Sequence, residues 1–110
     1  MDLGQQVEAL SRFNQKARVE LRLKGKRRTV DAQVWKVWAI HEAVGLEWIP
    51  EYTLTHIPTG LRVATHLSPS ALAVLAVQLD TVGDWGSSKK EELPFERAKE
   101  MLKEWNRNLP

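Results

Sequence analysis

The chain of 110 residues has no cysteine, little net charge and no long apolar run. Without cysteine it has no disulfide framework, no thiol redox chemistry and no cysteine-ligated zinc. Its longest apolar run, residues 71–77, is far shorter than the roughly 18 residues that a membrane-spanning helix needs. Residues 1–6 have neither the basic nor the apolar region of a secretory signal. We therefore expect a cytoplasmic protein that has no membrane partner.

The length predicts a single domain over residues 1–110. A chain of this size buries roughly two thirds of the surface that its unfolded form exposes, so it can fold without a metal or a disulfide. No internal repeat or low-complexity linker divides it.

The net charge of +2 conceals a strong asymmetry. Nine basic residues between Arg12 and Lys36 are opposed only by Glu20 and Asp31, so this segment carries +7 and the rest of the chain −5. Clustered charge creates a local potential that the total does not report. The asymmetry indicates an anionic partner.

Hydrophobic periodicity predicts an α+β fold with one N-terminal helix, a four-stranded antiparallel meander and two C-terminal helices packed on the sheet. Asp2 and Ser68 are the expected N-caps, and Gly83 is the expected end of the second helix. The segment 57–60, Ile-Pro-Thr-Gly, is typical of a tight turn. The expected helices are 3–16, 69–83 and 94–106, and the expected strands are 18–24, 34–41, 52–56 and 61–65.

The first expected strand and the loop after it, residues 24–28, form a basic ribbon. Arginines form bidentate contacts with phosphates, and a basic strand can follow a phosphate backbone. The competing explanation is a solvated edge strand that its charges protect from aggregation. The expected anion-binding or nucleic-acid-binding residues are Arg18, Arg22, Lys24, Lys26, Arg27, Arg28 and Lys36.

Five tryptophans are the other candidates for binding. Trp35 and Trp38 are three positions apart within one expected strand, so we expect them on opposite faces of the sheet. Trp48 and Trp85 lie in expected connections, and Trp105 lies on the apolar face of the last helix. We expect Trp48, Trp85 and Trp105 to contact a partner.

His56 and His66 flank the expected turn and could face each other across a hairpin, as a metal site or an acid–base pair requires. The spacing of the three histidines, however, fits no compact metal motif. Local hydrogen bonds within strands and loops are the favoured explanation. No catalytic residue, metal ligand or cofactor is predicted.

The segment from Trp38 to Leu79 contains Thr-His-Ile-Pro-Thr-Gly at residues 55–60, between two expected strands and ahead of a Ser-Pro-capped helix. It resembles small uncharacterised phage-encoded accessory proteins with a Thr-His-x-Pro-Thr-Gly turn. This resemblance implies a host-takeover or anti-defence factor that acts by binding.

The leading hypothesis is a non-enzymatic protein whose basic ribbon engages nucleic acid, a nucleotide signal or a nucleic-acid-handling host protein complex. The alternative is a protein–protein inhibitor or homo-oligomeric module that acts through the amphipathic C-terminal helix and exposed tryptophans. A third hypothesis is a histidine-based hydrolase. His56 and His66 are its candidate residues.

Overall fold

The alternating apolar and charged residues after Asn14 build a long antiparallel hairpin. In the computed structural model, which describes residues 1–44 and 51–109, β1 (Gln15–Leu23) pairs with β2 (Lys26–Trp35) over nine positions. Only Lys24 and Gly25 form the turn, and their φ angles of 44° and 79° are the two left-handed residues of a type I′ turn. The expected loop over 24–28 is therefore wrong, because the basic residues after Gly25 already belong to β2.

A second tight turn divides the segment that we expected to be one strand over 34–41. Trp35 at the end of β2 pairs with Trp38 at the start of β3 (Trp38–Glu42), and Lys36 in the turn has a φ of 53°. The sheet therefore has five strands and not four. Neither residue of the turn is a glycine or an asparagine, so the sequence carries no local turn signal there. The α+β class itself is confirmed.

The strands are arranged in chain order. After β3 come β4 (Tyr52–His56) and β5 (Leu61–His66), and all neighbours are antiparallel. The turn over 57–60 is confirmed: the Gly60 amide donates to the His56 carbonyl at 2.8 Å.

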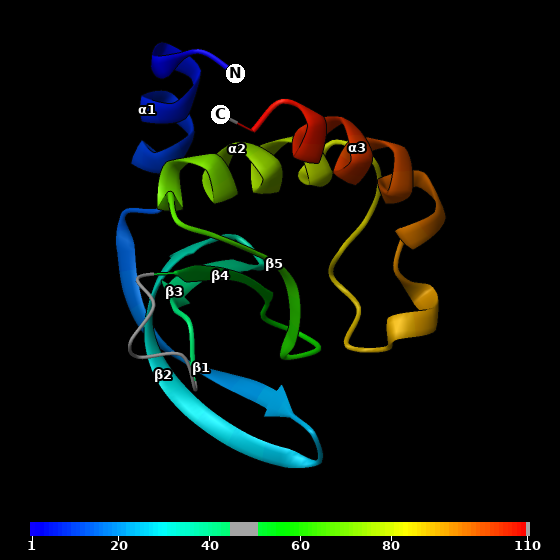
Figure 1. Cartoon of the computed structure of the whole chain (residues 1–110). Helices are drawn as coiled ribbons and strands as arrows, with labels where there is room; N and C mark the ends of the chain where they lie inside the picture. The colour runs from blue at the N-terminus through cyan, green and yellow to red at the C-terminus, as the bar shows by residue number, and fades with distance from the viewer. Residues whose placement is uncertain (45–50, 110) are drawn as a thin grey trace.

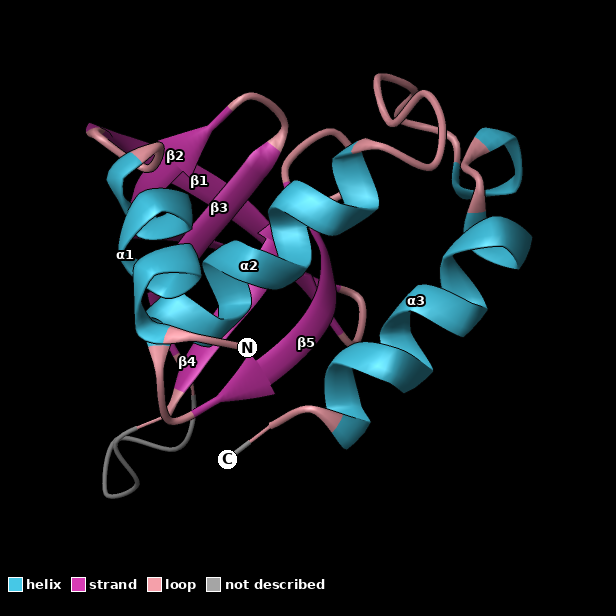
Figure 2. Cartoon of the chain, turned by 90° about the horizontal axis from the view of Figure 1, so that it is seen from above, coloured by secondary structure: helices cyan, strands magenta, loops and turns pink. Residues whose placement is uncertain are grey.

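The helices cover one face of this sheet, as Figure 1 shows. Helix α2 (Pro69–Asp80) crosses the sheet between α1 (Leu3–Ser11) and α3 (Phe95–Arg107), and a short 3₁₀ turn, η1 (Lys90–Glu92), precedes α3 (Figure 2). The expected caps Asp2 and Ser68 are confirmed, because their side chains accept hydrogen bonds from the Gln5 and Ala71 amides.

Two helix ends differ from expectation. Helix α1 stops at Ser11, because the chain from Gln15 onward pairs with β2. Helix α2 stops at Asp80, and Gly83 is not in the left-handed conformation of a C-cap. A Cβ on Gly83 would lie 2.8 Å from the Pro94 side chain, so this glycine allows close packing instead.

The main core lies between the sheet and the helices. The side chains of Trp38, Ile40 and Leu54 point from the sheet toward α2, which is buried almost all round, as its composition predicts. Helix α3 packs against this core through Ala98 and Trp105.

The apolar stripe of α1 faces outward. Leu3 and Val7 are 75% and 61% exposed, whereas Ala9 is buried against α2. The Ser70 hydroxyl donates to the Gln6 side chain at 3.0 Å, which helps to fix this orientation. A 3.6-residue period identifies an apolar face without saying what covers it.

The sheet curls so that β1 reaches the β4–β5 turn. The Arg22 amide donates to the Gly60 carbonyl at 2.9 Å. Gly60 has a φ of 70°, and a Cβ there would lie 3.1 Å from the Glu20 carbonyl oxygen and 3.2 Å from the Arg22 nitrogen. The absence of a side chain at Gly60 therefore allows both the left-handed turn and the close approach of β1.

Gly60→Ala should lower the free energy of unfolding by about 2 kcal/mol or more, because it adds a backbone collision to the left-handed strain of about 1 kcal/mol. Gly25→Ala is the matched control: its φ is 79°, but nothing lies within 4 Å of the added Cβ, so only the strain applies. Urea denaturation of both variants measures the difference. Equal losses would show that the contact between Gly60 and β1 contributes nothing.

Candidate anion-binding surface

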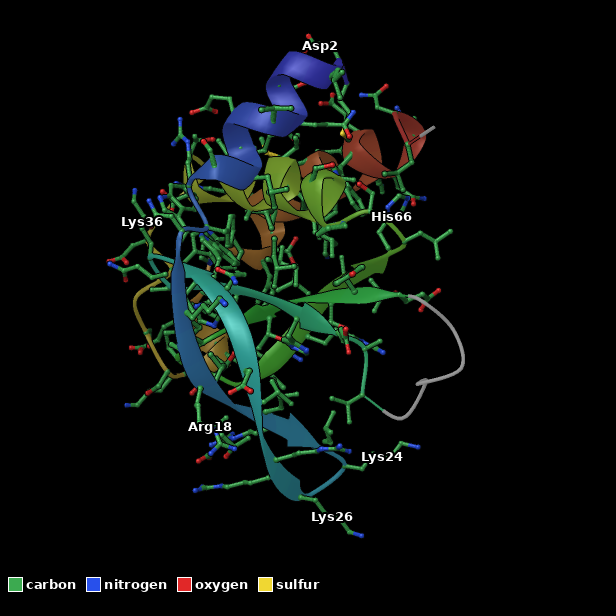
Figure 3. All side chains as sticks on the ribbon, turned by 90° about the vertical axis from the view of Figure 1, so that its left-hand side faces the viewer. Asp2, Arg18, Lys24, Lys26, Lys36 and His66 are labelled. Atoms are coloured by element: carbon green, nitrogen blue, oxygen red, sulfur yellow. The ribbon has the colours of Figure 1, made fainter. Side chains whose placement is uncertain are left out.

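The β1–β2 hairpin extends away from the helices and carries the predicted basic residues. In Figure 3, Lys24 and Lys26 lie at its tip and Arg18 lies closer to the body. Every residue from Arg22 to Thr29 is exposed. Seven basic and two acidic residues between Lys16 and Asp31 make this the most positive segment of the chain.

The strand register distributes these charges over two faces. Val19 and Leu21 are buried, so Arg18 and Arg22 point to the opposite, outer face of β1. Arg27 is directly opposite Arg22 and joins that face. Arg28 and Lys26 are opposite Leu21 and Leu23, so they belong to the inner face. The ribbon is therefore basic on both sides of its tip and not on one face alone.

Two carboxylates interrupt the outer face. Arg18 lies 3.6 Å from Asp31, and Arg27 lies 3.4 Å from Glu20. Asp31 is directly opposite Arg18 in the register. These exposed ion pairs contribute about 1 kcal/mol or less each. Arg22 forms no ion pair with any residue that the structure describes.

Lys36 does not belong to this surface. It lies in the β2–β3 turn, at the other end of the hairpin from Lys24 and Lys26 (Figure 3). Its ammonium is 2.7 Å from the Asp80 carboxylate and 4.9 Å from the centre of the Trp35 ring. The Trp38 indole also donates to Asp80, at 3.2 Å. Lys36 therefore helps to hold the turn against the end of α2.

Two of the expected partner-binding tryptophans, Trp85 and Trp105, are buried. Trp85 and Trp105 are only 3% and 5% exposed, and their indoles donate to the Leu79 and Ala71 carbonyls. The expectation that they are exposed contacts is wrong, because each folds back onto α2. Trp48 lies outside the described residues. Trp35 and Trp38 are paired across the β2–β3 turn and share one face, contrary to expectation.

The histidines have structural hydrogen bonds and do not form a common site. His56 is paired with Leu61 and His66 with Tyr52, so the two lie at opposite ends of the β4–β5 hairpin. The expectation that they face each other is wrong. His66 accepts a hydrogen bond from the Ser68 amide at 2.9 Å. In the described ranges 1–44 and 51–109, no three His, Asp or Glu side chains gather as a metal site would need.

Two buried histidines are held neutral. Burial lowers the pKa of His56 and of His41 below the ordinary value of 6.5, although each ring also bonds to a backbone carbonyl, which acts in the opposite direction. Because a carbonyl only accepts, the proton lies on Nε2 of His56, facing Trp85, and on Nδ1 of His41, facing Glu42. The second nitrogens accept from Thr59 and Thr55.

These lowered pKa values predict acid sensitivity. For each histidine, the unfolded chain binds more protons than the folded one at pH values between the lowered pKa of the folded state and the ordinary value of 6.5. The stabilisation is therefore fully present above about pH 7 and is lost as the pH falls below 6.5. Denaturation midpoints measured from pH 8 to pH 5 should show this loss. In the double variant His41→Gln/His56→Gln it should be much smaller; an unchanged pH dependence would assign the effect to other groups.

The concave face of the sheet holds polar residues that the sequence analysis did not identify as a site. A cavity of about 180 Å³ lies between the hairpin tip and strands β3–β5. His41, Thr53 and Thr55 in its wall are each at least 95% buried, and Thr65 and Arg62 lie opposite the two threonines. The alternation in Tyr-Thr-Leu-Thr-His, residues 52–56, could have indicated this polar face, because it places both threonines on the same side of the strand.

Comparison of the chain with protein-family models, curated proteins and solved structures finds no match in any of the three. No helix in the described part of the chain is long and apolar enough to cross a bilayer.

Proposed function

We propose that this protein is a non-enzymatic binding protein that engages an anionic partner, nucleic acid in the first place, through the β1–β2 hairpin. The observation that supports this most directly is the pairing of Arg22 with Arg27. Like charges directly opposite each other destabilise a sheet. With Lys24, Lys26 and Arg28 also exposed around them, a bound polyanion would offset this repulsion.

The shape of the ribbon supports the same proposal. A two-stranded β-ribbon fits the major groove of DNA, and arginines on it can bind phosphates or guanine edges. The tight type I′ turn leaves no long loop at the tip. Cations held on a rigid hairpin lose less freedom on binding than cations on a loop.

The competing explanation is protection of the sheet edge. β1 is an edge strand, and charged side chains on edge strands reduce aggregation. This explanation accounts for Arg18 and Arg22 on β1. It also applies to Arg27 and Arg28, because β2 pairs with β3 only over Gln33–Trp35 and the tip of the hairpin has a second free edge there. The binding experiment below therefore decides between the two explanations.

The triple variant Arg22→Glu/Arg27→Glu/Arg28→Glu should weaken binding to a fluorescently labelled DNA duplex by about tenfold or more. The slope of log affinity against log salt should fall by about 2 to 3 units, because each lost phosphate contact reduces it by about 0.9. Fluorescence anisotropy over a series of NaCl concentrations measures both quantities.

The matched control is Lys89→Glu/Arg97→Glu/Arg107→Glu, which changes the net charge equally at exposed positions away from the hairpin. It should keep most of the affinity and the salt slope. If the hairpin variant binds like the wild type, the ribbon only keeps the protein soluble.

The alternative, a protein-interaction or homo-oligomeric module, loses two of its three tryptophans and the face of α3 on which it rested. Trp85, Trp105 and the apolar face of α3 are used inside the chain. Among the described residues, the exposed apolar side chains that share one helix are Leu3, Val7 and Leu10 of α1. Sizing chromatography with light scattering on the wild type and on Leu3→Gln/Val7→Gln distinguishes a monomer from an associating form.

We keep the phage accessory or anti-defence role, and the cytoplasmic location, as part of the proposal. They rest on the Thr-His-x-Pro-Thr-Gly resemblance and on the sequence composition. A pull-down from host lysate with and without nuclease would separate a nucleic-acid partner from a host protein complex.

A further inference from the structure

We infer that the cavity between the hairpin tip and the concave face of β3–β5 binds a single phosphate group. The cavity lies on the other side of the sheet from the helices, and its walls come from β1, β3, β4 and β5. This site does not depend on the proposed function, because its key residues, Thr53, Thr65 and Arg62, lie outside the β1–β2 hairpin.

The two faces of β4 differ in polarity. On the helix side, Leu54 packs into the main core. On the concave side, Thr53 and Thr55 are 5% and 1% exposed. Burial of a hydroxyl group costs free energy unless it has a hydrogen-bond partner. Valine has the same shape without this cost, so threonines on this face indicate hydroxyl groups that contact water or a ligand in the cavity.

The hydroxyl groups are not equivalent. Thr55 donates to Nε2 of His41 at 2.8 Å, so its proton is already used. Thr53 is directly opposite Thr65, and no hydrogen bond of either hydroxyl occurs among the described residues. No fully buried side-chain oxygen in those residues lacks a partner, so both hydroxyls open onto the cavity. Cross-strand partners have Cβ atoms only about 5 Å apart. The two therefore form a pair of adjacent donors inside the cavity.

A guanidinium group supplies the positive charge at the cavity. Arg62 is opposite Thr55 in the register and lines the cavity, and it forms no ion pair within the residues that the structure describes. Arg22 also borders the cavity, but its side chain points to the outer face of β1. Glu51 is the one carboxylate in the lining. Guanidinium groups and hydroxyl donors are the groups with which proteins bind phosphate.

The size of the cavity limits the ligand to a small group. Pockets for drug-sized ligands occupy about 300–1,000 Å³, and this cavity is smaller, about 180 Å³. It suits one tetrahedral oxyanion, either free inorganic phosphate or the terminal phosphate monoester of a nucleic acid that the hairpin holds. A whole nucleotide would not fit inside.

Titration of the ¹⁵N-labelled protein with inorganic phosphate at constant ionic strength, with chloride as the reference anion, tests the inference. We expect saturable shifts of the Thr53, Gly60 and Thr65 amides. Arg62→Ala should weaken binding by about tenfold or more, and Thr53→Val by about threefold to tenfold, from the loss of charged and neutral hydrogen bonds respectively. Thr53→Val preserves shape, and urea denaturation verifies that each variant folds.

Arg27→Ala is the matched control, because Arg27 is on the outer face of the same hairpin and lies 3.4 Å from Glu20. It should leave phosphate affinity within about twofold. The same variant should weaken DNA binding if the proposed function holds, so the two proposals can fail separately. Absence of saturable shifts, or equal weakening by Arg27→Ala and Arg62→Ala, would overturn the cavity site.

A second comparison identifies the source of the phosphate. If an oligonucleotide with a 5′-phosphate binds more tightly than the same oligonucleotide without it, and Arg62→Ala removes the difference, the cavity receives a terminal phosphate. If inorganic phosphate binds but the 5′-phosphate adds nothing, the cavity takes the free ion. If neither binds, the cavity holds water only and the inference is wrong.

Discussion

The hydrogen bond from the Arg22 amide to the Gly60 carbonyl is the constraint on which both candidate sites depend. It joins the edge strand β1 to the β4–β5 turn, which are far apart in the sequence, and so bends the sheet. Together with the apolar contacts of Val19 and Leu21, it fixes the position of β1 relative to the β4–β5 turn. Gly60 makes the contact possible, because any side chain there would meet the backbone of Glu20 and Arg22.

The bent sheet separates two environments. Its helix side holds an apolar core in which Trp38, Trp85 and His56 pack edge to face, with ring centres 5.1 to 6.0 Å apart. Its concave side has a smaller apolar cluster around Val19 and Leu21 and, next to it, the row of polar groups in the cavity. Burial of the apolar side stabilises the fold. The concave side can therefore contain hydroxyl and imidazole groups without weakening the main core.

The hairpin and the cavity are adjacent but use different chemistry. The hairpin presents exposed cations, so its contribution to binding is long-range and depends on salt. The cavity offers directed donors from Thr53 and Thr65 with an arginine beside them, in a space that fits one phosphate. A polyanion on the hairpin and a phosphate group in the cavity are therefore compatible.

The sequence by itself determined the α+β class, both helix N-caps, the 57–60 turn and the basic segment, because each depends on neighbouring residues through periodicity, capping or turn chemistry. It did not show the turn at Lys36, where no glycine or asparagine marks the left-handed residue. Nor could it show that Leu3 and Val7 face outward while Trp85 and Trp105 are buried, since a period does not say what covers a face. Which charges share a face, and that Thr53, Thr65 and Arg62 surround one cavity, were decided only by strand register and by the contact between β1 and Gly60. Those contacts join residues far apart in the chain, and local patterns carry no information about them.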